Sequence, residues 1–530
     1  MITWQEMDDT GAPGADGGAA EGVPAGQARR RGFRKFADFF LLSFGYVGLR
    51  FLIGPIRSRL LTEQLGKPHY GALTLAVSTV TFLAMLLALG SYEFLARKLP
   101  GLPTGRQKGW LALVLRRLAL PGWLLAGAVA GGLWATGWFP SWHGSYVLLL
   151  WIDLGLMLWL LERIYYALGG NRIGTMRAIQ LFQNDVWFLV VFALGAWAAA
   201  SFAHTLRIWT AWLCAVALAV LAFDRQAEPA EAPQGEGMRE VLLFGMPLMP
   251  MVLGEILFRI ADRYLLLAFF DLAIVAEYML AMNIAMMGYV TGTSLLELSL
   301  PHLYAAANRH VREGGDRGNG GFWGGGMQPT DEMRRIFSLM LRHVTGLGAV
   351  MGLGFAFFRR DIFAVIAGPE FRDAASLMPW IAGIPLAFLL AMTAARALLV
   401  QNRTRTVGFA MLTAALANLA VDLVVVPLWG THGAAMATLG CLLGLAAFLC
   451  ATIDVRRWID RESWKPMHLL IGIAGCAAAD WGIVTLLPDA AWWVRLPLAA
   501  IPALLTGWLA RVFTPADMAL LKAANRSEEP

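Results

Sequence analysis

The chain has 530 residues, of which 58% are hydrophobic and 15% are charged, whereas about 25% of the residues of a typical soluble domain are charged. Together with a mean hydropathy of +0.58, this composition excludes a water-soluble globular protein. The net charge of +6 does not indicate a nucleic-acid partner, because the basic residues follow the loops of a membrane protein. The sequence therefore predicts an all-α fold, a polytopic bundle of transmembrane helices.

The chain begins with a tail, residues 1–35, which is rich in Gly, Ala and Pro. We expect this tail to be disordered and to end in a basic anchor at the membrane. About fourteen apolar blocks follow, each long enough to cross the roughly 30 Å hydrocarbon core as a helix. The predicted spans are residues 36–58, 72–95, 117–139, 145–168, 177–200, 205–224, 240–268, 273–300, 336–357, 374–400, 405–427, 431–454, 467–487 and 491–512.

Two polar stretches divide these spans. DRQAEPAEAPQGEG (224–237) follows the sixth span, and REGGDRGNGGFWGGGMQ (312–328) follows the eighth. Tyr70 and Tyr278 precede similar helix starts six helices apart, so we expect two pseudo-symmetric six-helix lobes plus two C-terminal helices. The predicted domains are the tail 1–35, the N-lobe 36–225, the linker 226–239, the C-lobe 240–455 with a Gly-rich loop at 303–335, helices 13 and 14 in 456–513, and a tail 514–530.

The basic residues predict the orientation of the chain. When the N-terminus is placed in the cytoplasm, 31 of the 43 Lys and Arg residues fall in cytoplasmic loops and 8 in outside loops. Cytoplasmic loops carry an excess of Lys and Arg in membrane proteins. We therefore expect both termini, the 226–239 linker and the 303–335 loop to be cytoplasmic.

The stretch GEILFRIADR (254–263) places four charged residues inside one predicted span. Glu255, Arg259 and either Asp262 or Arg263 follow i, i+4, i+7/i+8 spacing and therefore share one helical face. A charge facing hydrocarbon would cost about 2.5–3.5 kcal/mol, so this face must look into the bundle or into water. Two interpretations stay open: an ion-pair ladder that holds helices together, or a binding site in which Glu255 and Asp262 are resting counter-ions.

Arg50 is the counterpart of Arg259 in the first half, near the middle of the first span, and Arg57 follows at i+7. Because helices one and seven are equivalent in the two repeats, we expect Arg50 and Arg259 to face one cavity, with Arg57 and Arg263 beside them. A guanidinium stays charged when desolvated and its fork of donors matches phosphate oxygens, so this pair suits a diphosphate. The alternative for Arg50 is a snorkelling or carboxylate-paired side chain.

Three carboxylates, Asp153, Asp185 and Asp422, lie deep in predicted spans without an obvious partner nearby in the sequence. Such a group could carry a coupling proton or bind Na⁺, or it could form structural hydrogen bonds.

Two prolines, Pro247 and Pro250, interrupt the seventh span. Proline removes a backbone donor, and a broken helix persists in a membrane only where neighbours or a cavity satisfy the freed carbonyls. They predict either a hinge at the cavity or a static bend.

Five motifs carry a resemblance to a known family: RLLTEQLGKPHYGALTLA (59–76), FGMPLMP (244–250), ADRYLLLAFFDLAIVAEYMLA (261–281), ALLVQNRTRT (397–406) and NLAVDLVVVPLWGTHGAAMAT (418–438). In their order and helix positions they resemble the Wzx-type O-antigen and exopolysaccharide flippases of the MOP exporter superfamily. The resemblance implies a two-lobed bundle with a cationic cavity in the bacterial inner membrane. It implies a flippase that moves an undecaprenyl-diphosphate-linked oligosaccharide to the outer leaflet, as a monomer working with a polysaccharide polymerase and chain-length machinery.

Two other functions stay open. A membrane polysaccharide polymerase or glycosyltransferase would need a large outside loop or a paired acidic metal motif, and the sequence has neither. A small-molecule exporter of the same superfamily would share the fold, but the deep arginines favour an anionic substrate. We expect no enzyme activity, no catalytic residues and no cofactor, because the sequence contains no paired acidic motif, metal cluster or P-loop. We expect no metal-binding residues either, because the four cysteines lie singly in apolar segments.

Overall fold

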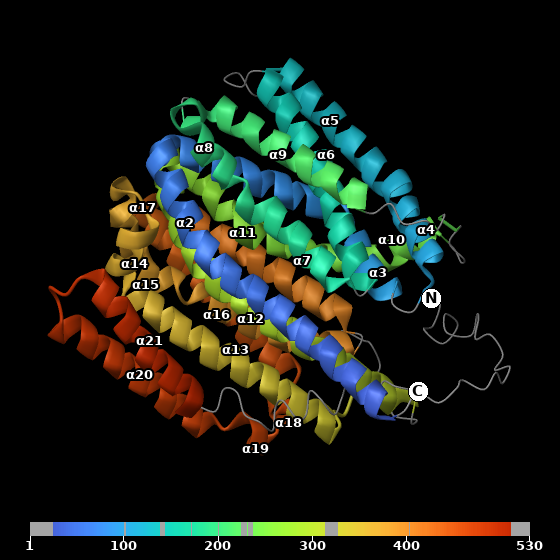
Figure 1. Ribbon diagram of the computed structural model, residues 1–530, viewed down its shortest axis with the longest axis vertical. Coiled ribbons are helices and arrows are strands. Elements are labelled where there is room, and N and C mark those ends of the chain that lie inside the picture. The colour runs from blue at the N-terminus through green and yellow to red at the C-terminus, as the bar shows by residue number, and fades with distance from the viewer. Residues whose placement is uncertain are drawn as a thin grey trace.

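The computed structural model describes residues 25–99, 102–137, 144–170, 172–199, 201–223, 230–231, 237–312, 327–401 and 403–509. Side chains are described from Gly45 onward, except at 97, 173, 196–199, 295, 297–298, 301, 304–305, 308, 311–312, 504 and 506–509. Across these residues the secondary structure is helical and contains no β-strand, which confirms the all-α prediction. The helices pack side by side into one bundle, and most of them run along the same diagonal in Figure 1.

The first half of the chain supplies the helices at the upper and front sides of Figure 1. Their bounds are α2 (Ala25–Leu87), α3 (Ser91–Lys98), α4 (Thr104–Val114), the π-helical turn η1 (Leu115–Ala119), α5 (Leu120–Ala135), α6 (Gly144–Gly169), α7 (Ile173–Leu181), the π-helical turn η2 (Phe182–Val186), α8 (Phe188–Ala199) and α9 (Phe202–Phe223).

The second half begins at α10, and its last two helices form the lower left edge of Figure 1. Its elements are α10 (Met238–Gly245), the 3-10 turn η3 (Met246–Leu248), α11 (Met249–Phe269), α12 (Leu272–Arg312), α13 (Asp331–Phe357), α14 (Arg359–Ile366), the 3-10 segment η4 (Pro369–Leu377), α15 (Met378–Ile381), α16 (Ile384–Val400), α17 (Thr404–Thr452), α18 (Val455–Trp458), α19 (Arg461–Trp464), α20 (Pro466–Leu486) and α21 (Trp492–Leu509).

Two of the long helices are interrupted at a glycine, and one of them is a helical hairpin. Gly66 interrupts α2 with φ 65°, and Gly430 interrupts α17 with φ 58°. Residues eight apart in a helix are about 12 Å apart, yet a Cβ on Gly433 would lie 2.7 Å from the Val425 carbonyl oxygen. The chain therefore reverses direction at Gly430, a backbone conformation that favours glycine.

The described residues contain eleven helical stretches that are long and apolar enough to cross a membrane. The stretches that contain the α2 and α17 breaks each cover two of the predicted spans, and α21 covers the fourteenth without being one of the eleven. Every predicted span thus coincides with a helix. The number of actual crossings and their orientation stay predictions.

Two predicted connections differ from the structure. Residues 25–35, expected in the disordered tail, begin α2, and α12 continues to Arg312, so the loop predicted at 303–335 is shorter. Thr330 then caps α13, because its side chain accepts a hydrogen bond from the Met333 backbone N–H. The rest of the predicted N-terminal tail, most of the Gly-rich loop, most of the 226–239 linker and the 514–530 tail lie outside the described residues.

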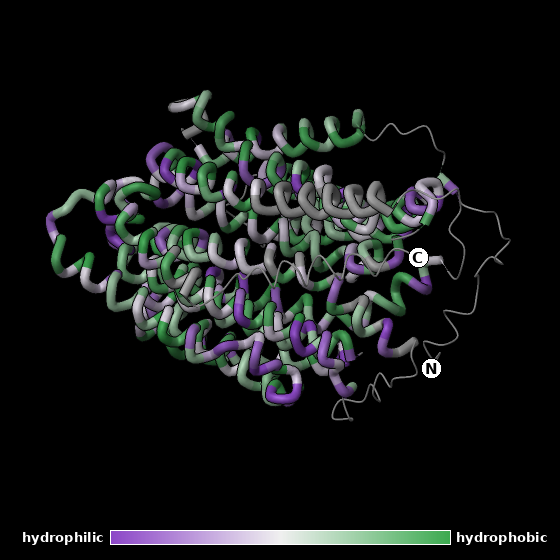
Figure 2. The backbone as a smooth tube through the Cα atoms, turned by 60° about the horizontal axis from the view of Figure 1, so that its bottom comes forward, coloured by the Kyte–Doolittle hydropathy of each residue, from purple (hydrophilic) through white to green (hydrophobic). Residues whose placement is uncertain are grey.

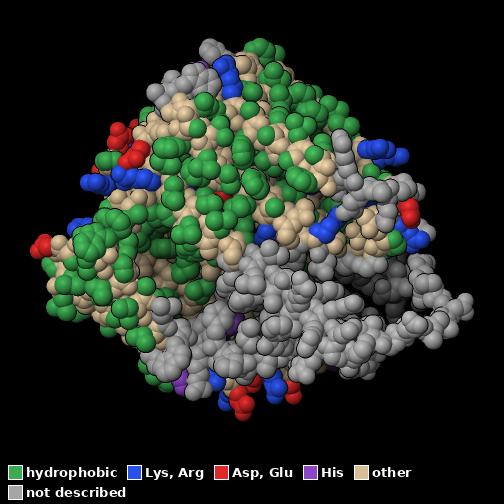
Figure 3. Space-filling view, viewed as in Figure 1, with side chains coloured by type: hydrophobic (Ala, Val, Ile, Leu, Met, Phe, Trp, Pro, Cys, Tyr) green, Lys and Arg blue, Asp and Glu red, His purple; other side chains and the backbone are tan. Residues whose placement is uncertain are grey.

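The outer surface is apolar, as contact with lipid requires. Large hydrophobic side chains such as Phe223 (90% exposed) and Leu486 (81% exposed) point outward, whereas soluble monomers rarely expose large apolar patches. Hydrophobic residues cover most of the helix lengths in Figure 2, and charged side chains lie mostly at the margins of the face in Figure 3. The chain is a multi-pass membrane protein.

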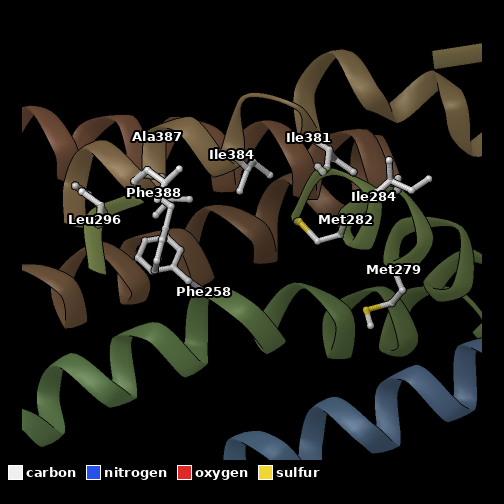
Figure 4. Packing of buried hydrophobic residues seen from close by; sticks show 14 of the residues in the cluster. Phe258, Met279, Met282, Ile284, Leu296, Ile381, Ile384, Ala387 and Phe388 are labelled. Atoms are coloured by element: carbon white, nitrogen blue, oxygen red, sulfur yellow. The ribbon is translucent and has the colours of Figure 1, made fainter. Parts of the chain in front are cut away.

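Apolar side chains fill the interior where α11, α12 and α16 meet. Phe258, Leu296 and Phe388 belong to one buried cluster, and Figure 4 shows Phe388 pointing toward Phe258. Polar residues placed among these side chains are therefore isolated from bulk water, which strengthens each charge interaction that they make.

Candidate functional site

Asp185 lies where two arginines of α2 meet the π-helical turn η2. Arg50 contacts it twice, with Nε 2.8 Å from Oδ2 and Nη2 3.2 Å from Oδ1. Arg57 donates from Nη1 to Oδ1 at 2.9 Å and to the Asn184 carbonyl oxygen at 2.7 Å. Because Arg50 and Arg57 are seven residues apart, two turns of helix bring both guanidiniums to one carboxylate.

A third arginine joins this group through Tyr46. The Arg50 guanidinium lies 5.6 Å from the centroid of the Tyr46 ring, and that of Arg177 lies 5.0 Å from it. Both distances are typical of cation–π contacts. We call Tyr46, Arg50, Arg57, Arg177 and Asp185 the N-terminal arginine cluster. It holds three positive charges and one negative charge, with Arg177 and Asp185 buried.

Arg259 occupies a separate place on α11. Its Nη2 lies 2.9 Å from Glu255 Oε1, as the i, i+4 spacing predicts. The guanidinium covers two rings, 5.0 Å from the centroid of Tyr289 and 5.4 Å from that of Phe388. Glu255 is therefore the counter-ion of Arg259, and the aromatic pair fixes its position.

Arg50 and Arg259 do not contact each other. Among the described residues, no ion pair, hydrogen bond or ring contact joins the N-terminal arginine cluster to Arg259. Arg50 donates to Asp185, one of the three carboxylates considered for ion coupling, and Arg259 pairs with Glu255, so each arginine contacts an acid of its own half. The prediction that both arginines face one cavity stays a prediction.

Asp262 and Arg263 have partners other than the predicted ones. Asp262 does not pair with a guanidinium; it accepts hydrogen bonds from the Tyr278 hydroxyl and from the Arg263 backbone N–H. Arg263 turns instead to α2, where its Nη1 donates to Ser78 Oγ at 2.6 Å. Both residues are buried. Arg263 thus links the two halves of the chain and does not complete an arginine pair.

An oxygen-rich cluster lies between α11 and the α17 hairpin. Asn418 donates to Asp422 Oδ2 at 2.7 Å, while Asn418 Oδ1, Asp422 Oδ1 and Thr438 Oγ1 are buried without a hydrogen-bond partner. Asp262 is close enough to Asp422 for the two carboxylates to interact electrostatically. The α17 hairpin, in which Gly433 packs against Val425, brings Thr438 back to the depth of Asp422. On that basis we group Asp262, Asn418, Asp422 and Thr438 as the α11–α17 oxygen cluster. Unsatisfied buried oxygens are costly, and a bound cation would satisfy them.

Asp153 is the third predicted carboxylate and has yet another environment. It is fully buried on α6, and neither of its oxygens has a hydrogen-bond partner. The structure therefore separates the three aspartates: Asp185 pairs with arginines, Asp422 lies among oxygens, and Asp153 has no charged partner.

The predicted prolines lie at a break in the seventh span. Pro247 is in η3 and Pro250 is in the first turn of α11. Just before the break, Gly245 lies so close to α3 that a Cβ would come 2.1 Å from the Leu89 carbonyl oxygen. The two halves of the chain are therefore in backbone contact beside this break, a suitable position for a hinge.

Several residues of the site were not identified from the sequence. Tyr46, Arg177, Tyr278 and Thr438 become neighbours of the predicted residues only through tertiary packing, and the Arg50–Asp185 contact spans 135 positions. Asn418 had a sequence signal, because it precedes Asp422 by four residues, one helical turn. Within the described residues no group of three or more His, Cys, Asp or Glu side chains gathers as a metal site.

No protein-family model matches the chain, and no curated protein matches it. Among solved structures it is similar to "Lipid II flippase MurJ, inward closed conformation", with a TM-score of 0.60, 12% identity, and coverage of 91% of this chain and 99% of that one. It is also similar to an outward-facing multidrug resistance MATE family transporter of the MOP superfamily (TM-score 0.55, 9% identity, coverage 83% and 99%). A MOP superfamily transporter from Pyrococcus furiosus gives a TM-score of 0.50 at 9% identity, with coverage of 83% and 99%.

These similarities establish the fold, because they extend over nearly the whole of each solved chain. The chain has the fold of the MOP superfamily transporters, as the sequence motifs implied. The Wzx-type branch and its polysaccharide substrate stay predictions.

Proposed function

We propose that this chain is a flippase that moves a polyprenyl-diphosphate-linked oligosaccharide from the inner to the outer leaflet of a bacterial inner membrane. The observation that carries the proposal is the N-terminal arginine cluster, in which Arg50 and Arg57 share the single carboxylate of Asp185 and Arg177 stacks on Tyr46 beside them. The two guanidiniums on Asp185 carry one positive charge more than that carboxylate supplies, in a part of the bundle where charge is expensive. A diphosphate diester carries about two negative charges, enough to take the place of Asp185 and pair with both guanidiniums.

The geometry suggests how the substrate would be accepted. In the empty state Asp185 holds both α2 guanidiniums in place. The diphosphate would replace Asp185 as their acceptor, because it offers more charge and more acceptor oxygens to the planar forks. Arg259, held by Glu255 on Tyr289 and Phe388, is a second exchange pair in the other half. It would meet the diphosphate after the halves move about the break at Pro247 and Pro250.

Transport would be coupled to a cation at the α11–α17 oxygen cluster. Two carboxylates, an amide oxygen and a hydroxyl oxygen are hard ligands of the kind that Na⁺ and other hard cations prefer. Three of the cluster's oxygens lack a hydrogen-bond partner. The cation is a co-transported substrate, and its entry would neutralise the repulsion between Asp262 and Asp422.

The competing functions have less support. A polymerase or glycosyltransferase would place its chemistry in an outside loop, but residues 359–377 form α14 and η4, whose Phe363 and Phe371 are buried in the bundle. A multidrug exporter of the MATE type has the same fold. An excess of guanidiniums would repel a cationic drug.

The proposal is tested by reconstituting the purified chain in liposomes with a fluorescent polyprenyl-diphosphate oligosaccharide and measuring how fast the lipid becomes accessible to a quencher outside. The double variant Arg50→Ala, Arg57→Ala should lose lipid movement. Arg495→Ala is the matched control, because Arg495 forms a similarly buried pair with Asp361 at 2.6 Å that shares no residue with the cluster. Unchanged lipid movement in the double variant would reject the diphosphate site, and movement of a cationic dye alone would favour the exporter.

A further inference from the structure

Asp153 has an unusual place for a carboxyl group in a membrane. It lies on α6 with no exposed surface, and neither Oδ1 nor Oδ2 has a hydrogen-bond partner. An ionised carboxylate without a partner in such surroundings costs several kcal/mol. The burial and isolation of Asp153 therefore indicate that the negative charge of its carboxylate is neutralised.

The neighbours of Asp153 on α9 are Thr210 and Cys214. The Thr210 hydroxyl donates its only hydrogen to the Leu206 carbonyl oxygen at 3.0 Å. The Thr210 hydroxyl is thus directed toward its own helix, and the Cys214 thiol is a weak donor. Neither group supplies the strong donor that a buried carboxylate would need, whereas a carboxylic acid carries its own hydrogen.

The charged groups on the helices packed against α6 are occupied elsewhere. None of them is among the groups that act on Asp153. On α2 and η2, Arg50, Arg57 and Asp185 pair with one another, Arg59 pairs with Glu63, and Lys67 pairs with Glu277. On α6 itself, Glu162 accepts from Ser91 and Arg163 stacks on Trp159. Arg177 of α7 stacks on Tyr46, Arg172 stacks on Tyr166, Lys98 of α3 pairs with Glu240, and Arg106 of α4 pairs with Glu231. Glu93 of α3, Lys108 of α4 and His204 of α9 have other interactions, and Arg116, Arg117 and Arg207 are exposed.

A metal cation fits this position poorly. Hard cations take about six or more oxygen ligands, whereas the side chains that act on Asp153 in the described structure add one hydroxyl, that of Thr210, and its neighbour Cys214 is a thiol. A proton needs one carboxylate oxygen and one acceptor, and both are present. The site therefore differs in kind from the α11–α17 oxygen cluster, where two carboxylates, an amide and a hydroxyl gather.

We propose that Asp153 is a proton-binding site, protonated in this conformation, and that it couples a proton to transport separately from the cation at the α11–α17 oxygen cluster. The coupling part rests on the proposed function, whereas the protonation part does not. The proton leaves when water reaches the contact between α6 and α9, and the ionised form then disfavours the return of that contact.

Protonation is tested without any transport substrate. Infrared spectra of the purified protein should contain the C=O stretch of a protonated carboxylic acid that is present in the wild type and absent from Asp153→Asn, a variant of nearly the same shape. As a measurement that needs no variant, N,N′-dicyclohexylcarbodiimide, which reacts with protonated carboxyls in apolar surroundings, should label Asp153 in the wild type. Asp185 should stay unlabelled, because the guanidiniums of Arg50 and Arg57 cover its carboxylate oxygens. A spectrum unchanged by Asp153→Asn, or labelling that spares Asp153, would overturn the proposal.

Coupling is tested in the same liposomes as lipid movement. Asp153→Asn should lose its response to an imposed pH gradient, so that the ratio of rates with and without the gradient falls to about one, while it keeps its response to Na⁺. Asp422→Asn should show the reverse. A pH response retained in Asp153→Asn would overturn the coupling role. If no lipid moves in the wild type, the proposed function fails, but the infrared and labelling results still decide whether Asp153 holds a proton.

Discussion

Replacing Asp185 by Asn should destabilise the protein and at the same time make it more responsive to its lipid. The substitution keeps the shape of the side chain but removes the charge that two guanidiniums share, at 2.8 and 2.9 Å. Removing one partner of a fully buried pair costs about 3–5 kcal/mol, and an exposed pair contributes at most about 1 kcal/mol. The Arg50 and Arg57 side chains are 26% and 22% exposed. We therefore expect a loss of roughly 2–4 kcal/mol.

The assay is the apparent melting temperature of the detergent-purified protein, with and without polyprenyl-diphosphate oligosaccharide. In Asp185→Asn no carboxylate competes for the guanidiniums, so the lipid should raise the melting temperature more than it does in the wild type. A ligand at about 100 times its Kd adds about 2.7 kcal/mol, enough to offset most of the loss. Asp361→Asn is the matched control, because it also orphans a buried arginine, Arg495. The lipid should raise its lowered melting temperature by no more than it raises that of the wild type. The reasoning is refuted if Asp185→Asn melts like the wild type, or if the lipid rescues both variants equally.

Three further predictions concern helix packing, cation coupling and topology. Gly71→Ala should cost about 1–3 kcal/mol in thermal unfolding, because a Cβ there would lie 2.2 Å from the Leu272 carbonyl oxygen, whereas Gly440→Ala, with open space around it, should be neutral or stabilising. Asp422→Asn should abolish the Na⁺ dependence of lipid movement while membrane levels stay normal, and retained dependence would place the cation elsewhere. A reporter fused at residue 320 should be cytoplasmic, and periplasmic activity there would contradict the predicted topology.

Most of the helices could be predicted from the sequence, because the bilayer determines how long and how apolar each of them must be. A membrane-spanning segment must be apolar over about 20 residues and must satisfy its own backbone, so each apolar block coincides with a helix. The predicted helix ends are wrong where the chain leaves the hydrocarbon core, because the bilayer no longer limits the helix there. Helices α2 and α12 extend beyond the predicted spans, at residue 25 and residue 312, because nothing in the hydrocarbon requirement stops a helix that continues beyond the bilayer.

The contacts of the site could be predicted only between residues that are close in the sequence. Glu255 and Arg259 pair at i, i+4 as predicted, because helical periodicity alone brings them together. Asp185 looked unpartnered because its two arginines are 128 and 135 positions away. Asp262 was predicted to be a counter-ion because helical spacing puts it on the same face as Arg259, yet the Tyr278 hydroxyl of α12 donates to it. Which acid meets which base depends on helix packing, and a single sequence does not encode that pairing in any local pattern.

The α17 hairpin shows how a local backbone feature can create a site that neither helix has alone. Asp422 lies eight residues before Gly430 and Thr438 lies eight residues after it, so at about 1.5 Å per residue both lie about 12 Å from the reversal and at the same depth. Moving the reversal by one residue would rotate one of the two side chains by about 100° around its helix. Gly430 has φ 58°, where a side chain would strain the backbone. The oxygen cluster between α11 and α17 therefore depends on the position of one glycine that contributes no ligand.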